Sequence, residues 1–581
     1  MQSLYQEIIA EIPQYLQQYI VDQNYQRYTS RDHALWRYIM RRNLAFLQEH
    51  AHSSYLNGLE KTGISIDRIP HIDDMNKSLS KMGWKAVIVD GFLPPAVFME
   101  FQFHKILVIS ADMRSIQHVL YTPAPDIVHE AAGHAPIIAD EEYAEFLQKF
   151  GEYGMKAFSS KLDNEIYEAI RHLSIIKEYP DTSKEELEKA KKNLNAKIAL
   201  NTDPSEMTKL SRLHWWTVEY GLIGTPESYK LYGAGLLSSV GESKNCLNPS
   251  VKKLPLSVEC TNHNYDITKE QPQLFVNKDW RHLLNVLEEF SDSLSFRTGG
   301  NKAIETAIAS NSAATCTLSS GLQISGVLSR LLKDQDDNPA YLKTTGATSL
   351  AYNNRQINEH GIDYHADGFG SPVGVIKNLT KPLEELSNSE MKQFGFEKGK
   401  NISFEFSSGI VVKGKLINFV RENGSLQILT FDNCKVISPN AEELFNPAWG
   451  LFDMAVGLSV DSVYSGTADK QKHNVYPPKS NQIAIPIKYS EKDQSKFKAY
   501  NEICNIRTTN IIDPKKLNSL WDKLEKDDLT EWLIDLEMVE LAQIINDMDL
   551  INKIKNELKI LAKQSEEKKD IIESGLKLLD G

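Results

Sequence analysis

Cysteine is scarce in this chain, with five in 581 residues and no two of them close enough to form a C-x-x-C pair. Disulfide-rich secreted domains and zinc ribbons are built on such pairs, so both classes are disfavoured. An odd and scattered set of thiols is typical of a reducing compartment, and we therefore expect a cytoplasmic protein. The five are Cys246, Cys260, Cys316, Cys434 and Cys504.

Long hydrophobic runs and an excess of positive charge are also missing. The longest apolar stretch, residues 445–460, contains Pro447 and Asp453 and is too short and polar to cross a bilayer. The N-terminus carries Glu7 and Glu11 and lacks the basic segment of a signal peptide. A net charge of −13 disfavours nucleic-acid binding, because phosphates are bound by clustered lysines and arginines. We expect a soluble protein whose partners include neither a membrane nor a nucleic acid.

The chain does have an ordinary globular composition, with 41% hydrophobic and 25% charged residues. Its length requires more than one hydrophobic core. We expect a mainly α domain with short β-strands over residues 1–300, which contains a charged helical insertion at about 160–210. A small β-rich domain is expected over residues 301–480, followed by a helical tail over residues 481–581.

The spacing of apolar residues supports the predicted β-rich domain and the predicted helical tail. Residues 400–440 alternate apolar and polar side chains, and the pair Asn423-Gly424 between two such runs indicates a β-hairpin. The last part carries apolar side chains at steps of three and four residues, as amphipathic helices do. We expect these helices either to form a homo-oligomer or to pack on the β-rich domain.

A candidate metal site is the most informative feature of the sequence. His129 and His134 lie five residues apart, and Glu219 follows 85 residues later with no cysteine nearby. Two imidazoles and one carboxylate cover one face of an octahedral metal and leave three positions open, as in non-heme Fe(II) oxygenases. A zinc protease instead places its histidines four residues apart on one helical face. On a regular helix a spacing of five swings the second ring about 140° away, and we expect Gly133 to relax the backbone so that the rings converge.

The sequence around these residues resembles the pterin-dependent aromatic amino acid hydroxylases, over roughly residues 20–295. The resemblance rests on several motifs in the family's order: GFLPPAVFMEF, YTPAPDIVHEAAGH, TVEYGL, YGAGLLSSVGE and NYDITKEQPQLFV. It implies the family's catalytic fold, Fe(2+) bound by His129, His134 and Glu219, and tetrahydropterin as the co-substrate. The implied reaction uses O2 to hydroxylate an aromatic ring, with one oxygen atom going to the ring and the other to the pterin.

The resemblance also implies binding residues. On the pterin side, Phe98 matches the stacking ring, Leu93 a backbone contact, and Glu130 an acid that reaches the pterin through water. Glu242 matches a carboxylate that supports the ligands. On the substrate side, Arg114 matches the group that binds the amino acid's carboxylate. The remaining matched substrate positions are Thr122, Pro125, Trp215, Tyr220, Gly235, Ser238 and Ile267.

Two of these positions favour phenylalanine as the substrate. Trp215 stands where phenylalanine and tyrosine hydroxylases have Trp, and Ile267 stands where tyrosine hydroxylases carry Asp. An apolar wall suits a ring without a hydroxyl, because a buried hydroxyl needs a partner. We expect phenylalanine 4-monooxygenase activity that forms tyrosine. The alternatives are tyrosine or tryptophan hydroxylation, a zinc hydrolase, and a degenerate hydroxylase that acts as a binding scaffold. His214 and the insertion depart from the family pattern.

A second group of histidines and acids lies in the β-rich part. The sequence HGIDYHADGFG contains His360 and His365 together with Asp363 and Asp367. Such a group can bind a metal, but His/Asp pairs in glycine-rich loops are usually solvated turns, and we expect solvated turns here.

Overall fold

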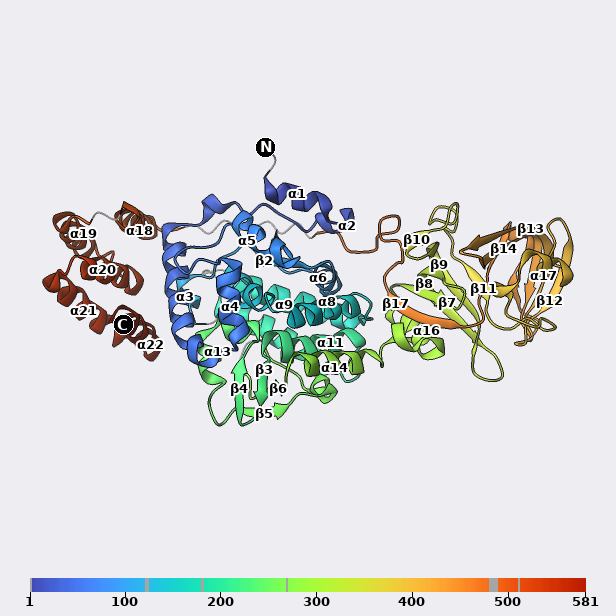
Figure 1. The fold of residues 1–581 in the computed structure, drawn as a ribbon, viewed down its shortest axis with the longest axis horizontal. Helices are drawn as coiled ribbons and strands as arrows, with labels where there is room; N and C mark the ends of the chain where they lie inside the picture. The colour runs from blue at the N-terminus through green and yellow to red at the C-terminus, as the bar shows by residue number, and fades with distance from the viewer. Residues whose placement is uncertain are drawn as a thin grey trace.

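The computed structural model describes residues 3–120, 125–178, 182–267, 270–479, 489–509 and 512–580. Within these ranges the chain forms a helical region with short strands, a β-rich region and a set of C-terminal helices. The helical region occupies the middle of an elongated molecule, with the β-rich region at one end and the C-terminal helices at the other (Figure 1). None of the helices within the described ranges combines the length and hydrophobicity that a membrane crossing requires.

The helical region buries most of its apolar side chains in one continuous core. Two short strands, β1 and β2, run parallel to each other, and a mixed sheet has the order β4-β3-β6-β5. The strands are β1 (Lys85–Val89), β2 (Ile106–Ser110), β3 (Leu222–Thr225), β4 (Ser228–Leu231), β5 (Lys252–Pro255) and β6 (Gln273–Asn277). The longer helices are α1 (Leu4–Glu11), α3 (Ser30–His50), α4 (Ser53–Thr62), α5 (Ile72–Leu79), α6 (Pro95–Phe103), α8 (Glu141–Gly154), α11 (Glu206–His214) and α14 (Trp280–Ser291).

The predicted insertion is a pair of helices, α9 (Lys161–Glu178) and α10 (Lys184–Leu200). They pack on one another and share a small apolar core of their own, centred on Leu173 and Leu194. The charged side chains of this segment face solvent because only one stripe of each helix is apolar.

The β-rich region contains two antiparallel sheets. Their order is β10-β9-β8-β7-β17, with β11 on β9, and β12-β13-β14-β15, with β16 on β14. Asn423 and Gly424 both have positive φ and join β13 to β14, which confirms the predicted hairpin. The strands are β7 (Ala313–Leu318), β8 (Leu322–Lys333), β9 (Pro339–Tyr352), β10 (Arg355–Gln356), β11 (Gly370–Pro372), β12 (Asn401–Glu405), β13 (Val411–Glu422), β14 (Ser425–Ile437), β15 (Glu443–Phe445), β16 (Phe452–Ala455) and β17 (Val460–Ser465).

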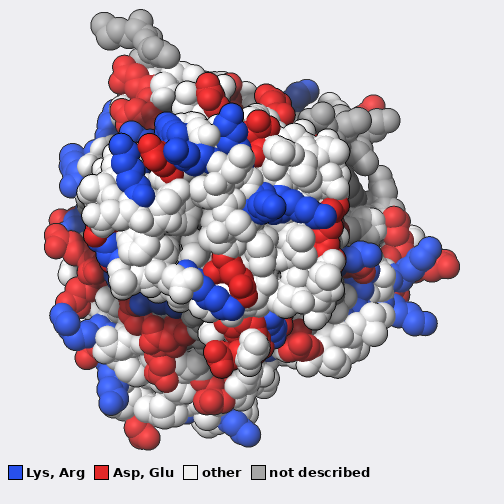
Figure 2. All heavy atoms as spheres, turned by 90° about the vertical axis from the view of Figure 1, so that its right-hand side faces the viewer, with Lys and Arg blue, Asp and Glu red and all other residues white. Residues whose placement is uncertain are grey.

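The β-rich region is attached to the helical region by the segment after β17. Lys470 forms a buried ion pair with Glu100 of α6, with 2.8 Å between Nζ and Oε2, and the hydroxyl of Tyr476 also donates to this carboxylate. The face at this end of the molecule shows acidic and basic side chains interspersed among broad uncharged areas (Figure 2). Charge of a single sign therefore does not dominate the face shown.

The C-terminal helices pack on α3, and the expectation that they would pack on the β-rich region is wrong. Their apolar side chains belong to the same core as the helical region. Arg37 of α3 forms a buried two-bond ion pair with Glu537, in which both nitrogen–oxygen distances are 3.0 Å, and Arg507 also binds Glu537. The arginines of α3 therefore hold the C-terminal helices by ion pairs in addition to apolar contacts. The helices are α18 (Glu491–Thr509), α19 (Pro514–Lys526), α20 (Trp532–Ile544), α21 (Met548–Ala562) and α22 (Glu566–Asp580).

Candidate metal centre and substrate cavity

The two histidines converge because their segment is a π-helix. The π-helix η4 (Val128–His134) has hydrogen bonds between residues five apart, so side chains at this spacing lie on the same face. Gly133 contributes by close packing: a Cβ there would lie 2.7 Å from the carbonyl oxygen of Ala234. The expected convergence is thus present, but the π-helix produces it, and Gly133 allows α12 (Ala234–Ser238) to approach.

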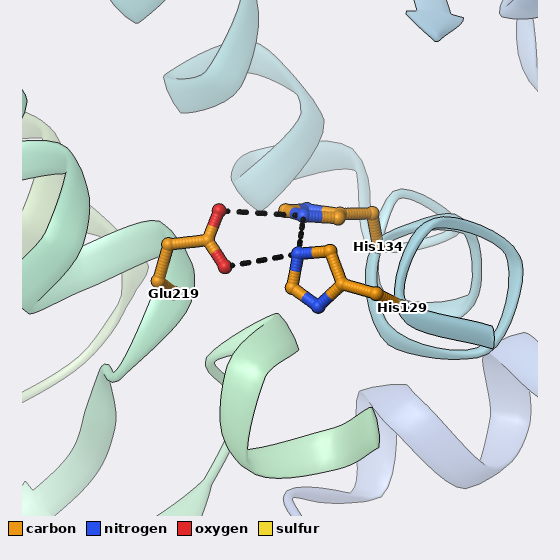
Figure 3. Close-up of side chains that lie close together, drawn as sticks. All are labelled: His129, His134 and Glu219. Atoms are coloured by element: carbon orange, nitrogen blue, oxygen red, sulfur yellow. Dashed lines mark hydrogen bonds and ion pairs between the residues drawn. The ribbon is translucent and has the colours of Figure 1, made fainter. Parts of the chain in front are cut away.

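Glu219 is the last residue of a second π-helix, η5 (Trp215–Glu219). Its carboxylate points toward both imidazoles (Figure 3), with 3.2 Å from Oε2 to Nε2 of His129 and 3.4 Å from Oε1 to Nε2 of His134. The two Nε2 atoms are 3.1 Å apart. Two atoms bound about 2.1 Å from one ion, 90–109° apart, are separated by about 3.0–3.4 Å. The donor set therefore fits a single metal ion.

A hydrogen-bond chain sets the tautomer of His129. The hydroxyl of Ser238 donates to the carbonyl oxygen of Ala234 at 2.8 Å, and its oxygen lies 3.0 Å from Nδ1 of His129. Because the hydroxyl proton is donated to Ala234, the Ser238 oxygen accepts a hydrogen bond from Nδ1–H of His129. This tautomer leaves the lone pair of Nε2 available to a metal. Ser238, predicted as a substrate residue, thus contacts a predicted ligand.

Burial and mutual charge determine the protonation of the acids in this site. Burial by itself would raise the pKa of Glu219, but the two adjacent imidazoles hold its pKa well below the usual range. Burial raises the pKa of Glu130 to about 8, and the Glu219 charge adds to this effect while His134 opposes it. Burial also lowers the pKa of His214 to about 4, so this imidazole is neutral at pH 7.

The three predicted ligands lie beside a cavity of about 370 Å³. Glu219 and His129 line it directly, and His134, which is not a lining residue, contacts both of them. The predicted Thr122 lies outside the described residues. The other predicted binding residues all line this cavity: Leu93, Phe98, Arg114, Pro125, Glu130, Trp215, Tyr220, Gly235, Ser238 and Ile267. Glu242 lies behind the wall, where the Tyr220 hydroxyl approaches its carboxylate at 3.4 Å.

Asp126 binds two of the three guanidinium nitrogens of Arg114. Its Nε and Nη2 bind the carboxylate of Asp126 at 2.7 and 2.8 Å, in a pair that is almost completely buried. Its Nη1 is buried and has no hydrogen-bond partner among the described residues. A buried N–H without a partner is costly, and this one belongs to a side chain that lines the cavity. The arrangement suits an incoming carboxylate.

Stacked aromatic rings form one wall of the cavity. The Trp215 ring lies parallel to Tyr265 at 4.3 Å between centroids and stacks on Tyr220 at 4.6 Å. Sequence reasoning missed Tyr265, although it lies two residues before Ile267 in one of the family motifs. Phe98 meets His214 edge to face at 5.8 Å. Such a wall suits a flat apolar ring.

The insertion contributes to this cavity. Ile170 and Ser174 of α9 line it, and a second cavity of about 630 Å³ lies between α9, α10 and α11. The two cavities share Tyr265 and Ile267. The insertion therefore lies at the side of the cavity where the predicted specificity residue is found.

Comparisons with known proteins agree with the motifs. The family described as biopterin-dependent aromatic amino acid hydroxylase matches residues 2–169 and 189–300. The phenylalanine-4-hydroxylase of Chromobacterium violaceum is 30% identical over 223 residues, which are 38% of this chain and 60% of that protein. The corresponding protein of Pseudomonas aeruginosa is 27% identical over 280 residues, covering 48% of this chain and 89% of that protein.

The chain spans about 60% of the length of the Chromobacterium violaceum and Ralstonia nicotianae relatives. Among solved structures, the Chromobacterium violaceum phenylalanine hydroxylase with bound oxidized Fe(III) shares 26% identity. The match covers 50% of this chain and 92% of that one, with a TM-score of 0.38. The family match ends at residue 300, and the β-rich region lies beyond it. Through its first 300 residues, this chain belongs to the biopterin-dependent aromatic amino acid hydroxylase family.

Proposed function

We propose that the chain is a non-heme iron monooxygenase that converts L-phenylalanine to L-tyrosine with O2 and tetrahydropterin. The observation that carries the proposal is the coincidence of three features at one cavity: a His–His–Glu cluster with metal-ligand spacing, an arginine nitrogen without a partner among the described residues, and an aromatic wall. His129, His134 and Glu219 would hold Fe(2+), which supplies the activation of O2 when bound.

The residues around the cluster position the two organic reactants. Nη1 of Arg114 binds the carboxylate of the amino acid, while Asp126 fixes the guanidinium. The Trp215 and Tyr265 rings hold the aromatic side chain and exclude water from it. Phe98 offers a face to the flat pterin ring, and Leu93 and Glu130 line the same cavity. Ser238 keeps the His129 ring oriented toward the cluster.

Ile267 supports phenylalanine over tyrosine as the substrate. It is half-buried in the cavity wall and offers no hydrogen bond, so a substrate hydroxyl at this wall would lose a partner that it has in water. Tyrosine and tryptophan are kept as alternative substrates.

The decisive experiment uses the full chain, because the C-terminal helices share a core with α3. Anaerobically Fe(II)-loaded protein would be mixed with a tetrahydropterin and O2, and phenylalanine, tyrosine and tryptophan offered separately. We expect tyrosine from phenylalanine, coupled to pterin oxidation. Pterin oxidation without a hydroxylated product would show that none of the amino acids offered is the substrate. Bound iron without turnover would favour the scaffold alternative. Tightly held zinc with peptidase activity would favour the hydrolase.

We further propose the three-part division at about residues 300 and 480, and a reducing, cytoplasmic location. The separate apolar cores of the β-rich sheets support the first boundary. The five free cysteines, four of them buried, support the location. Self-association through the C-terminal helices is a further proposal, and it is supported by the exposed side chains of Ile544, Met548 and Ile560.

A further inference from the structure

We propose that His360, His365 and Asp453 bind a second divalent transition-metal ion, in the β-rich region and independently of the proposed iron site. All three residues are buried, and one ligand atom from each lies within 4.8 Å of the other two. Two imidazoles and one carboxylate are ligands of the Zn2+ class of ions.

Folding brings the three residues together from two sheets. His360 and His365 lie in the loop between β10 and β11, which belong to one sheet, and Asp453 lies on β16 of the other. The loop is fixed on β9, because the amides of Leu350 and Thr348 donate to the carbonyls of His360 and His365 at 2.9 and 3.1 Å. The site is therefore built on ordered backbone at the junction of the sheets.

The imidazoles already have the separation of two ligands on one ion. Nδ1 of His360 lies 3.1 Å from Nε2 of His365, within the range of about 3.0–3.4 Å expected for neighbouring ligands about 2.1 Å from a metal. The alternative is a hydrogen bond between two neutral rings, and the experiment below separates the two.

The buried carboxylate provides the strongest argument for a cation. Asp453 is 6% exposed, and the described part of the chain shows no ion pair between it and a lysine or arginine. The groups near it are hydroxyls: Thr430 Oγ1 donates to Oδ1 at 2.7 Å, and the Tyr364 hydroxyl lies near the carboxylate. Buried charges in proteins are paired or coordinate metals. A divalent ion between Asp453 and the imidazoles supplies the missing positive charge, and the hydroxyls orient the ligand.

The surroundings leave a way in and a position for water. Tyr364 is 50% exposed and packs its ring edge to face against His365, with 4.7 Å between centroids. On the inner side, the Phe369 ring meets His365 at 5.2 Å. Three protein ligands below a half-exposed tyrosine leave at least one coordination position for water. Asp363 and Asp367, the acids of the same loop, are exposed and do not belong to the cluster.

The test is the zinc stoichiometry of the full-length protein, demetallated and then equilibrated with Zn2+ at a concentration that saturates the tighter sites. Inductively coupled plasma mass spectrometry after gel filtration would count the bound ions. We expect two equivalents for the wild type, one for His134→Gln and one for His365→Gln. The double variant should bind none. Asp363→Asn and Asp367→Asn are matched controls and should keep two.

The affinity of the second site is measured separately, by Zn2+ titration in the His134→Gln background. There we expect Asp453→Asn to weaken zinc binding at least tenfold. One equivalent in the wild type and none in His134→Gln would overturn the proposal, however the other variants fold. Two equivalents that persist in both His365→Gln and Asp453→Asn would also overturn it, because the second ion would then be bound elsewhere.

Discussion

The two His–His–carboxylate clusters of this chain have the same spacing between their histidines and different backbones. In both, the histidines are five residues apart and the carboxylate follows 85 or 88 residues later. In both, the nearest imidazole nitrogens are 3.1 Å apart. The first pair reaches this distance on a π-helix and the second on a loop fixed to β9. Spacing along the chain therefore does not reveal which local structure brings the rings together.

The surroundings of the clusters differ more than the ligands do. The first opens into a cavity with an arginine nitrogen and stacked rings, and the second lies between two sheets behind a single tyrosine. A metal bound at the first cluster could contact two organic molecules in the cavity. A metal bound at the second cluster would mainly join two sheets. The environment, and not the ligand set, separates the two proposed roles.

The largest expected effect comes from His134→Ala, which removes a proposed iron ligand. Hydroxylation should fall by at least about 1000-fold, or about 4 kcal/mol of transition-state stabilisation. Tyrosine formation from phenylalanine measures the loss, and Asp363→Asn, in the loop of the second cluster, is the control that should keep full activity. Activity within tenfold of the wild type would show that the first cluster is not the site of hydroxylation.

Arg114→Lys probes the cavity beside the first cluster. Lysine keeps the charge but lacks the planar fork in which two nitrogens bind Asp126 and a third is left for a substrate carboxylate, so kcat/KM for phenylalanine should fall roughly 100-fold. The matched control is Arg330→Lys in the β-rich region, where an exposed arginine binds Glu442 through two nitrogens at 2.5 and 2.7 Å. Steady-state kinetics should show the control unchanged. An equal loss in both variants would contradict a role in substrate binding.

Supporting hydroxyls allow a direct comparison of the clusters. Ser238→Ala removes the group that contacts Nδ1 of His129, and Thr430→Val removes the group that donates to Asp453. Each should weaken metal binding at its own cluster by about 10-fold or more and leave the other unaffected. Competition with a chelator, monitored in backgrounds that lack the other cluster, measures both affinities. A change at both clusters would show that the effect is global.

The smallest effect concerns pH and the wall behind the first cluster. Burial raises the pKa of Glu242 to about 7, with Glu270 adding to the shift and the Tyr220 hydroxyl opposing it. The folded state then binds more protons than the unfolded state between pH 4.5 and 7. This group therefore lowers stability as pH rises through that range, by about 1 kcal/mol per pH unit. Glu242→Gln should flatten this slope, measured as thermal unfolding midpoints of metal-free protein from pH 5 to 8. An unchanged slope would show that Glu242 does not cause this pH dependence of stability.

The family motifs alone located the first cluster and most residues of its cavity, because these residues lie in short segments of recognisable sequence. Tyr265 was missed because an isolated tyrosine carries no functional signal. In the second cluster, the sequence points to His360 and His365 but predicts solvated turns with Asp363 and Asp367 as partners. That expectation is wrong: the structure buries both rings, and their carboxylate comes from Asp453 on another sheet.

The sequence by itself determined the family, the predicted iron ligands and the hairpin at Asn423-Gly424, because each depends on local patterns of residue type. The tertiary structure decided the π-helices, the spare nitrogen of Arg114, the docking of the C-terminal helices on α3 and the cluster at Asp453. The last two depend on contacts between distant segments. Such contacts are fixed by packing and by the pairing of buried charges, neither of which has a signature along the chain.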